Sequence, residues 1–492
     1  MTFPKAGRAA DALLAELEAR KANDVRWAEG RVFAYVYDAG PAVMEVVKTA
    51  YSAYLTENGI DPTSFPSCLE LERDVIAAAL DLHNAPREAK GSFTSGGTES
   101  ILLSVKTARD HARATRPEVT APELVLPETA HPAFFKACAY FDVKPVVTRV
   151  DPVSFTALPA AMAQALTDQT IMMVASAPSY AHGVIDPVAE IGQVALKAGI
   201  LFHVDCCVGG MYLPFARRLG ADIPQFDLST PGVTQMSLDF HKWGYAAKGA
   251  SCVLYADGAL RKHQIFAWSG WTGYTIVNPT ILSARSGGPI AGAWAALNFL
   301  GEEGYLRLAR ITQDASAKIC KAIEDTEGLR LLGSPPCNLL AFTADGFDIF
   351  ALADAMKARG WFLQPQFGFG PSPANLHISV GVSNAPHVDA MLADLRSETA
   401  RLLADPQYRA VPPGEADIAA ITAMGPGELL DAMEGMFTGG TGGMPDEMRP
   451  INVLMDAMPF DARDRILKEY MNRLYAKDRA GAPPHDAAQH PG

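Results

Sequence analysis

Two lysines stand close together in a short stretch that is suited to amine chemistry. Residues 237–249 read S-L-D-F-H-K-W-G-Y-A-A-K-G, so Lys242 follows a histidine directly and Lys248 comes six residues later. The apolar pattern ahead of this stretch predicts a short buried strand, which would hold Lys242 at a strand end. A lysine must be neutral to attack a carbonyl, and we expect burial beside Phe240 and Trp243 to disfavour its ammonium form. Taken alone, the stretch also fits surface lysines whose stems lie along aromatic rings.

A glycine-rich turn that leads straight into a helix suggests an anion site earlier in the chain. Residues 91–104 read G-S-F-T-S-G-G-T-E-S-I-L-L-S, and the small residues give way to a helical apolar pattern. We expect Thr98 to cap this helix. The unpaired N–H groups and the positive end of the helix dipole point the same way, which favours a bound phosphate. A capping loop without a ligand is the alternative.

Strand-like and helical runs alternate between these two stretches and beyond them. The strand-like runs are 124–126, 145–148, 170–175, 200–204, 234–238 and 251–255, and helical runs are 130–141, 154–166 and 188–198. This alternation predicts an α/β fold with a mostly parallel sheet covered on both faces. Asp205 follows the run 200–204, at the strand end where such sheets bind ligands. An unpaired carboxylate at that place would be costly.

A phosphate cradle, an acid at one strand end and a lysine at a later strand end together meet the needs of pyridoxal 5′-phosphate. The turn at 95–98 would take the phosphate. Asp205 would keep the pyridine nitrogen protonated, and Lys242 would attach the cofactor covalently. The combination favours function for each element, although each one alone does not.

Composition limits the other classes of function. With 492 residues the chain exceeds one usual core, so we expect two lobes with terminal extensions. The net charge of −13 disfavours a nucleic-acid partner. Seven cysteines without C-x-x-C spacing predict reduced thiols in a cytoplasmic enzyme, with no zinc or other metal site. Residues 1–20 suggest an amphipathic helix and no signal peptide, and no apolar run is long enough to span a membrane.

Four motifs together resemble the pyridoxal-phosphate lyases that cleave sphingosine 1-phosphate. They are T-S-G-G-T-E-S-I-L-L-S at 94–104, S-A-P-S-Y-A-H-G-V-I-D-P at 176–187, H-V-D-C-C-V-G-G at 203–210 and H-K-W-G-Y-A-A-K-G at 241–249. The similarity continues through 279–305 and covers the chain from about residue 30 to beyond 380. It implies the group II decarboxylase branch of the aspartate aminotransferase fold, fold type I, with a large cofactor domain and a small α/β domain.

The resemblance also implies roles for individual residues. Catalysis would rest on Lys242, Asp205, His131, Lys248 and Tyr180, with His131 stacked on the cofactor ring. Cofactor contacts would come from Ser95, Gly96, Gly97, Thr98, His131, Ser176, Asp205, His241 and Lys242, while Gly287 and Gly288 would reach the phosphate of the neighbouring subunit's cofactor. The substrate pocket would hold Tyr37, Asn58, Asp61, Tyr180, Lys248 and His377. Sites shared in this way imply a homodimer.

Some positions depart from the family pattern. The lyases read V-Y-H-G-G and N-P-L-H-P where this chain has Asp38 and Asp61. A carboxylate repels a substrate phosphate, so the substrate would lack a phosphate or carry an amine, and Asp61 would be a partner for Lys248. Cys206 stands where a small alanine often packs under the ring. His377 replaces the arginine that holds an α-carboxylate in aminotransferases, a change that the lyases share and that favours carbon–carbon cleavage.

The sequence therefore predicts an aldehyde lyase that cleaves a long-chain 2-amino alcohol or its phosphate. An amino acid decarboxylase is the alternative, and a catalytically silent binding protein is a second. The general base stays open among Lys248, Tyr180 and a water. The expected parts are a dimer-wrapping segment 1–66, a cofactor domain 67–311, a small domain 312–403 and a helical tail 404–492. We expect the tail to have a flexible glycine-rich linker at 438–443 and disorder from 480 on.

Overall fold

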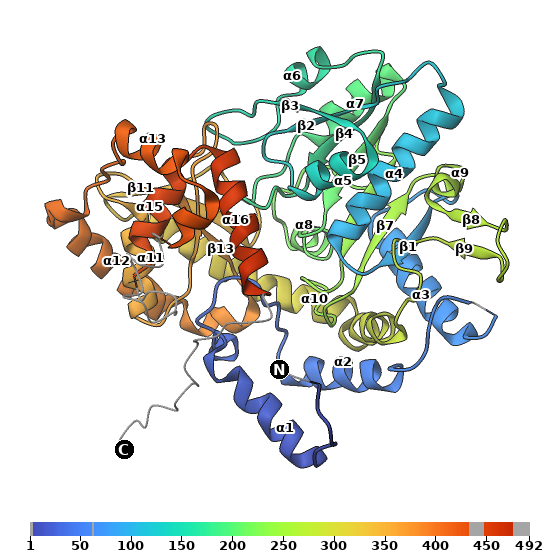
Figure 1. The fold of residues 1–492 in the computed structure, drawn as a ribbon, viewed down its shortest axis with the longest axis horizontal. Helices are drawn as coiled ribbons and strands as arrows, with labels where there is room; N and C mark the ends of the chain where they lie inside the picture. The colour runs from blue at the N-terminus through green and yellow to red at the C-terminus, as the bar shows by residue number, and fades with distance from the viewer. Residues whose placement is uncertain (1–2, 62, 432–446, 476–492) are drawn as a thin grey trace.

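Seven strands form one sheet at the centre of the large lobe (Figure 1). The computed structural model describes residues 3–61, 63–431 and 447–475. The strands lie in the order β1 (Lys90–Thr94), β7 (Ser251–Tyr255), β6 (Gln235–Asp239), β5 (Leu201–Cys206), β4 (Thr170–Ser176), β2 (Glu123–Pro127) and β3 (Lys144–Thr148). β7 is antiparallel to both of its neighbours, and the other neighbouring pairs are parallel. The mostly parallel α/β sheet expected from the sequence is confirmed.

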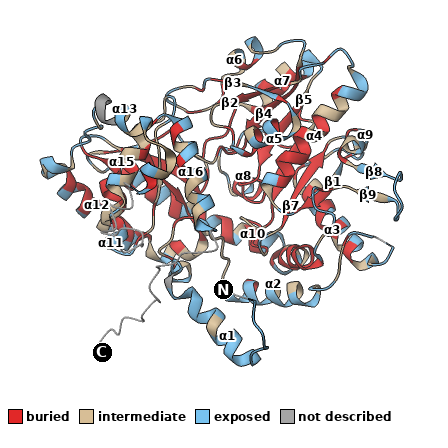
Figure 2. Cartoon of the chain, in the orientation of Figure 1, coloured by how far each residue is buried: buried red, intermediate tan, exposed pale blue. Residues whose placement is uncertain are grey.

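Helices cover both faces of this sheet and make two apolar cores. One face packs against α4 (Gly97–Thr115) and α5 (Ala133–Phe141). The other packs against α2 (Pro41–Ala53), α3 (Pro66–Leu82), α6 (Pro159–Gln164), α7 (Val188–Ala198), α8 (Leu213–Arg218) and α10 (Gly287–Glu324). Every residue of β2, β4, β6 and β7 is buried, which explains the continuous apolar runs at 171–175 in β4 and 252–255 in β7, whereas the buried strand β6 alternates polar and apolar residues. Figure 2 shows this burial concentrated in the sheet and the inner helix faces.

Several boundaries differ from the sequence expectation for local reasons. The helix expected at 154–166 is limited to α6, which begins at Pro159 because proline fits the first helical turn. Thr98 is not the cap of α4, because the helix already begins at Gly97 with Gly96 as the N-cap residue. Strand β1 and the hairpin β8 (Phe266–Trp268) and β9 (Ile276–Asn278) were not expected. A short helix, α9 (Gly258–Arg261), and the 3-10 turn Lys262–Gln264 complete the lobe, while the 3-10 turns Arg20–Asn23 and Trp27–Glu29 belong to the N-terminal segment.

The small lobe is a four-stranded antiparallel sheet with helices against it. Its strands lie in the order β10 (Leu329–Leu331), β11 (Leu339–Ala344), β13 (Asn375–Ser379) and β12 (Gln364–Gln366). Helices α11 (Ile349–Ala358) and α12 (Val388–Ala404) enclose its core, and 3-10 turns span Val382–His387 and Pro406–Tyr408. Helix α10 joins the lobes, since it buries Ile290 in the large core and Ile319 in the small one. It bends at Gly301, whose φ is 55°.

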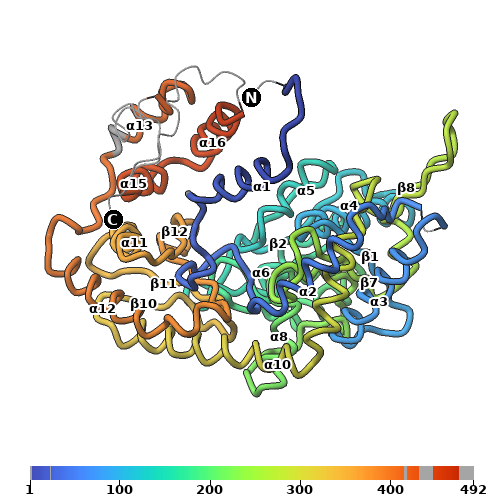
Figure 3. The backbone as a smooth tube through the Cα atoms, turned by 90° about the horizontal axis from the view of Figure 1, so that it is seen from below, coloured from blue at the N-terminus to red at the C-terminus, as the bar shows by residue number. Residues whose placement is uncertain are grey.

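The two ends of the chain are helical. Helix α1 (Ala10–Ala19) buries none of its residues and projects from the body in Figure 1. At the other end, α13 (Glu415–Ala423), α15 (Arg449–Ala457) and α16 (Phe460–Leu474) gather on the side of the small lobe (Figure 3) and share a small apolar core. The expected linker at 438–443 and tail from 480 lie outside the described residues. Among the described helices, none has the length and apolar character to cross a membrane.

Candidate active site

A cavity of about 510 Å³ opens where β4, β5 and β6 end and α4 begins. It brings together most of the residues expected from the sequence: Tyr37, Ser95, Gly96, Gly97, Thr98, His131, Ser176, Tyr180, Asp205, His241, Lys242 and Lys248. Asn58, Asp61, Gly287, Gly288 and His377 are not among its lining residues. One chain thus supplies both lysines, the strand-end acid and the glycine-rich turn to a single space.

Lys242 is paired with an acid that the sequence analysis overlooked. Its Nζ lies 2.8 Å from Oδ2 of Asp239, the last residue of β6. Burial has the largest single effect and lowers the pKa of Lys242, but the attraction of Asp239, Cys207 and Tyr37 together outweighs burial and raises that pKa above its ordinary value. Our expectation that burial keeps this amine neutral is therefore wrong for the protein without cofactor. Oδ1 of Asp239 is buried without a hydrogen-bond partner, so this acid still has an acceptor to offer inside the cavity.

Asp205 is fixed at the cavity floor by hydrogen bonds to one of its oxygens. The Cys207 amide donates to Oδ1 at 2.9 Å, and the Ser237 hydroxyl donates to the same oxygen at 3.2 Å. Burial opposes the charged form, yet His131 and the Cys207 hydrogen bonds more than compensate and hold the pKa of Asp205 below its ordinary value. A carboxylate that stays ionised in a buried site is suited to pair with a protonated ring nitrogen.

The glycine-rich turn forms a cradle at the start of α4. Backbone amides of the first helical turn have no partner within the helix, so they remain available to an anion. The Ser95 amide is an exception because it donates to Oε2 of Glu99 at 2.6 Å, which leaves Ser95 its hydroxyl for a ligand. A Cβ at Gly97 would come within 2.7 Å of Cys207 Sγ and 3.1 Å of the Asp239 carboxylate. The cavity wall therefore needs glycine at this position.

Two histidines lie beside the cradle, and in each of them one ring nitrogen already accepts a backbone hydrogen bond. His241 Nδ1 accepts the Ala250 amide at 3.1 Å, and its Nε2 lies 3.5 Å from Asp239 Oδ2. His131 Nδ1 accepts the Ala133 amide at 3.2 Å. These bonds fix the orientation of both rings, each of which lines the cavity. Together with the ionised acid and the open amides, this donor set fits pyridoxal 5′-phosphate.

The cysteine that faces the cavity is Cys207, not Cys206. Cys207 lines the cavity beside Asp205, whereas Cys206 packs into the apolar core on the opposite face of β5. Successive side chains of a strand point to opposite faces, so a group beneath a bound ring must lie two residues after Asp205. The sequence assignment of Cys206 to this place is corrected accordingly.

The outer part of the cavity is lined by aromatic side chains and one cation. Lys248 Nζ lies 4.9 Å from the centre of the Tyr37 ring and 3.3 Å from the carbonyl oxygens of Tyr35 and His241. Partial burial and the nearby Lys242 lower the pKa of Lys248. Tyr180 donates to Oε1 of Gln364, in the small lobe, at 2.8 Å, and burial raises the pKa of Tyr180 to about 12. Both lobes therefore contribute to this end of the cavity.

His377 supports the cavity from behind. Its ring stacks on Tyr180 with centroids 4.4 Å apart, and its Nε2 bonds the Ser379 hydroxyl at 3.1 Å. Complete burial lowers the pKa of His377 to about 4, so the ring is neutral near pH 7. The structure thus places this residue against Tyr180 and not against the cavity space.

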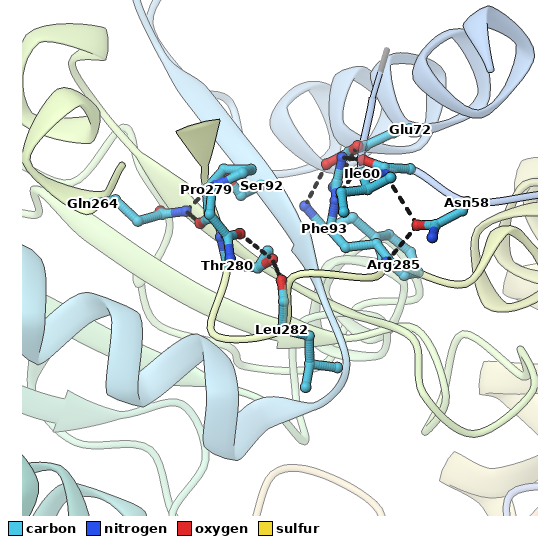
Figure 4. A network of polar contacts seen from close by, with 12 residues as sticks. Asn58, Ile60, Glu72, Ser92, Phe93, Gln264, Pro279, Thr280, Leu282 and Arg285 are labelled. Atoms are coloured by element: carbon cyan, nitrogen blue, oxygen red, sulfur yellow. Dashed lines mark hydrogen bonds and ion pairs between the residues drawn. The ribbon is translucent and has the colours of Figure 1, made fainter. Parts of the chain in front are cut away.

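Asn58 belongs to a polar network elsewhere on the lobe (Figure 4), and Gly287 and Gly288 are the first residues of α10, just after Arg285 of that network. Asn58 Oδ1 accepts the amides of Ile60 and Arg285, and Arg285 reaches Glu72 at 2.7 Å. The Gly287 amide donates to the Glu57 carbonyl at 2.9 Å. Within one chain, these residues hold residues 57–60 against the start of α10, and they do not contact the cavity.

Asp61 does not pair with Lys248, which corrects that expectation. It is exposed, and its oxygens accept hydrogen bonds from Thr63 and Ser64. These bonds keep its pKa below the ordinary value. Asp38 accepts the Gly40 amide at 3.0 Å and does not line the cavity. The repulsion of a substrate phosphate that we expected from these acids therefore does not arise within one chain.

Sequence reasoning missed several residues that line the cavity, among them Asp239, Cys207 and Glu99. Asp239 stands three residues before Lys242 in S-L-D-F-H-K, and a strand-end acid ahead of the lysine was a usable signal. Glu99 accepts the amides of Ser95 and Ile281, so it joins the cradle to the segment before α10. No local pattern distinguishes Glu99 from an ordinary acid in the first turn of a helix.

Comparison with known proteins places these features in context. Residues 2–345 match the family model described as pyridoxal-dependent decarboxylase conserved domain, and residues 398–473 match the pyridoxal-dependent enzyme, C-terminal putative HTH domain. The sphingosine-1-phosphate lyase of Oryza sativa is 41% identical over 401 residues, 80% of this chain and 73% of the rice protein.

Solved structures agree with these matches. The Burkholderia pseudomallei sphingosine-1-phosphate lyase superposes with a TM-score of 0.79 at 33% identity, and the alignment covers 83% of this chain and 94% of that one. The Lactobacillus brevis glutamate decarboxylase superposes with a TM-score of 0.71 at 20% identity, covering 84% of this chain and 96% of that one. The second likeness shows the shared fold.

Proposed function

Because this chain belongs to the pyridoxal-dependent decarboxylase family, in its sphingosine-1-phosphate lyase branch, we propose that it cleaves a phosphorylated long-chain 2-amino alcohol between Cα and Cβ and releases an aldehyde. It is a pyridoxal-phosphate-dependent carbon–carbon lyase. The observation that carries the choice of substrate is the composition of the cavity wall, which has a cation for a phosphate and no arginine for an α-carboxylate among the described residues.

The absence of an arginine from the described lining of the cavity favours the lyase over the amino acid decarboxylase. Bidentate arginine is the usual partner of a substrate α-carboxylate, because two parallel N–H groups match the two oxygens. Where the small domain of related aminotransferases provides that arginine, this chain has the buried, neutral His377 behind Tyr180. A 2-amino alcohol has no α-carboxylate and needs no such partner.

Lys248 is the candidate partner of the substrate phosphate. Among the described residues it forms no ion pair with a carboxylate, and its Nζ contacts two carbonyl oxygens and the Tyr37 ring. A cation that is held at the cavity mouth without a counter-ion can take an anionic group at little cost. This placement supports a phosphorylated substrate over the substrate without a phosphate, or with an amine, that Asp38 and Asp61 suggested.

Each residue of the cavity has a separate task in the proposed reaction. When bound, pyridoxal phosphate supplies an electron sink for the pair left by the broken bond. Lys242 would hold the cofactor, Asp205 would keep a proton on the ring nitrogen, and His131 would cover the ring. Tyr180 keeps its proton at neutral pH because its pKa is about 12, so it orients groups as a donor and is disfavoured as the base. Because Lys248 would hold the phosphate as an ammonium group, which has no free lone pair, a water remains to accept the hydroxyl proton.

The proposal includes a homodimer in which each chain completes the other's site. The start of α10 and the loop at Asn58 lie away from their own cavity, and beside them the β8–β9 hairpin exposes Phe266, Trp268 and Val277. Exposed apolar side chains gathered in this way are typical of a surface that another protein covers. Sedimentation should give a dimer, and a monomer with full activity would contradict this part. In this dimer, residues 1–66 would wrap around the partner subunit. Residues 67–311 would form the cofactor domain, 312–403 the small domain and 404–492 the helical tail.

A cytoplasmic location is part of the same proposal. All seven cysteines are free thiols, which suits a reducing compartment. Fractionation of cells that express the protein would test it, and recovery in an oxidising compartment would contradict it.

Product analysis tests the reaction itself. Purified holoenzyme is incubated with a sphingoid base phosphate, with the unphosphorylated base, and with a panel of amino acids. We expect a long-chain aldehyde and the matching phosphorylated amine from the first substrate, detected by mass spectrometry, and no carbon dioxide from the amino acids. If carbon dioxide is the only product found, the lyase proposal is wrong and the decarboxylase takes its place. Lys242→Ala is the control for non-enzymatic cleavage.

A further inference from the structure

A buried chain of hydrogen bonds runs from helix α4 to the acid at the cavity floor. Ser104 Oγ lies 2.8 Å from His203 Nδ1, and His203 Nε2 lies 3.0 Å from Ser237 Oγ. The Ser237 hydroxyl lies 3.2 Å from Asp205 Oδ1. The four residues come from α4, β5 and β6, so these hydrogen bonds lie between helix α4 and the one sheet face that it covers.

Asp205, at the end of this series of hydrogen bonds, determines which group donates and which accepts in each of them. Asp205 is ionised and can only accept, so the Ser237 hydroxyl must donate to it. The Ser237 oxygen then accepts from His203, which places the ring proton on Nε2. His203 Nδ1 is thereby left as an acceptor for the Ser104 hydroxyl. All donors point toward Asp205, and aligned hydrogen bonds of this kind polarise one another.

His203 takes part as a neutral dipole and not as a charge. Its side chain is completely buried, and burial lowers its pKa to about 4, against a smaller opposite effect of Asp205. Ser104 and Ser237 are also completely buried. Apolar side chains would fill these sheet positions at lower cost, because each buried polar group must find a partner. The presence of three buried polar residues in one series therefore indicates a role that concerns Asp205, to which the series leads.

We propose that Ser237, His203 and Ser104 are positioning residues that hold Asp205 ionised with Oδ2 turned to the cavity, so that they set the protonation of the cofactor's ring nitrogen. This inference rests on the role of Asp205 in the proposed function. Both hydrogen bonds to the carboxylate go to Oδ1. Fewer donors at Oδ1 would make Asp205 more basic, and the shared proton would move from the ring nitrogen toward the carboxylate.

The test measures that proton directly. Apoenzyme of the wild type and of Ser237→Ala is reconstituted with pyridoxal phosphate carrying an isotope label at the ring nitrogen, and the NMR shift of that nitrogen is followed with pH. We expect the shift of the ring nitrogen in Ser237→Ala to lie closer to the unprotonated value than in the wild type at the same neutral pH, because the shared proton lies nearer to the Asp205 carboxylate. The kcat should fall about tenfold with KM nearly unchanged, because the lost hydrogen bond is to a charged group.

A series of variants distinguishes an effect that passes through this relay, the hydrogen bonds from Ser104 through His203 and Ser237 to Asp205, from a general loss of core packing. Ser104→Ala, two bonds further from Asp205, should move the ring-nitrogen shift in the same direction by less, and His203→Asn should lie between. Ser100→Ala is the matched control, since Ser100 is a buried serine of the same helix whose hydroxyl bonds Thr94 and Ser251 and not the relay. It should lower the melting temperature without moving the ring-nitrogen shift.

Two results would overturn the proposal. One is an unchanged ring-nitrogen shift in both Ser237→Ala and Ser104→Ala, with stability lowered as in Ser100→Ala. The other is an equal shift in all variants, which would indicate general loosening. If Ser237→Ala does not fold, Ser104→Ala decides by the same measurement. A wild type that fails to bind pyridoxal phosphate would instead refute the proposed cofactor site, so the two failures are distinguishable.

Discussion

The floor and the mouth of the cavity are built in different ways. The floor consists of Asp205 and Asp239, which lie on neighbouring parallel strands and are buried in the sheet. The mouth consists of Tyr37, Tyr180 and Lys248, which come from three loops and depend in part on Gln364 of the small lobe. The residues proposed to hold the cofactor are thus fixed by the sheet. The residues proposed to contact the substrate lie on loops, which can vary in sequence without disturbing the sheet.

Removal of Lys242 should have the largest effect and would test whether the floor alone binds the cofactor. In Lys242→Ala we expect the visible absorbance of the bound cofactor to disappear and activity to fall by about a thousandfold or more. Asp239 would then lack its partner. Absorbance that survives gel filtration in this variant would contradict the assignment of Lys242.

Asp205→Asn should come next, since it leaves the shape of the floor and removes its charge. We expect kcat to fall about a hundredfold, comparable with loss of one preorganised electrostatic group, while KM changes little. Steady-state kinetics with the phosphorylated substrate would measure both constants. An effect confined to KM would place Asp205 in substrate binding and remove the distinction between floor and mouth.

Lys248→Met should show the opposite pattern at the mouth. It keeps the apolar stem and deletes the charge, so KM for the phosphorylated substrate should rise about tenfold, the loss expected for one charge-assisted hydrogen bond. The unphosphorylated base should be nearly unaffected and serves as the internal control. Equal losses for both substrates would contradict a phosphate contact.

The pH dependence of KM provides a milder test of the same lysine. Partial burial and Lys242 lower the pKa of Lys248 from its ordinary value, so its charge is complete at low pH and is lost below the pH at which an exposed lysine titrates. KM for the phosphorylated substrate should therefore rise as the pH increases through that lowered pKa. The rise should be absent in Lys248→Met, and its persistence there would point to another group.

Asp61→His should have the smallest effect. Asp61 is exposed and bonded to its own turn, and surface substitutions usually change stability by about 0.5 kcal/mol or less. We expect kcat/KM for the phosphorylated substrate to stay within about twofold of the wild type. A large gain would show that Asp61 enters the partner's cavity in the dimer and repels the phosphate there.

The sequence predicted the floor better than the mouth, and the reason is physical. Asp205 and Lys242 follow apolar runs, and parallel strands bring their carboxyl ends to one edge, so proximity follows from topology. Asp61 and Asn58 occupy a loop whose path depends on Arg285, more than two hundred residues away, and no local pattern shows this contact.

Charge and side-chain direction were harder to predict than position. The neutral state expected for Lys242 is wrong because Asp239 lies at the end of β6, where its attraction, together with that of Cys207 and Tyr37, exceeds the effect of burial. Side chains alternate between the two faces of β5, so Cys207 and not Cys206 lies on the same face as Asp205. Both errors concern what surrounds a residue and not where the chain places it.

Helix α10 connects the two lobes and the face proposed to meet a partner. Its first residues are held by Glu57 on the face proposed to meet a partner, and its last turns are buried in the small lobe. The helix therefore connects the proposed subunit boundary with the core of the small lobe, which also carries Gln364, the support of Tyr180. Its bend at Gly301 lies inside the large lobe, because Tyr305 and Leu308, which follow the bend, are buried in the large core. A single helix thus joins the proposed subunit boundary, the large core and the small core.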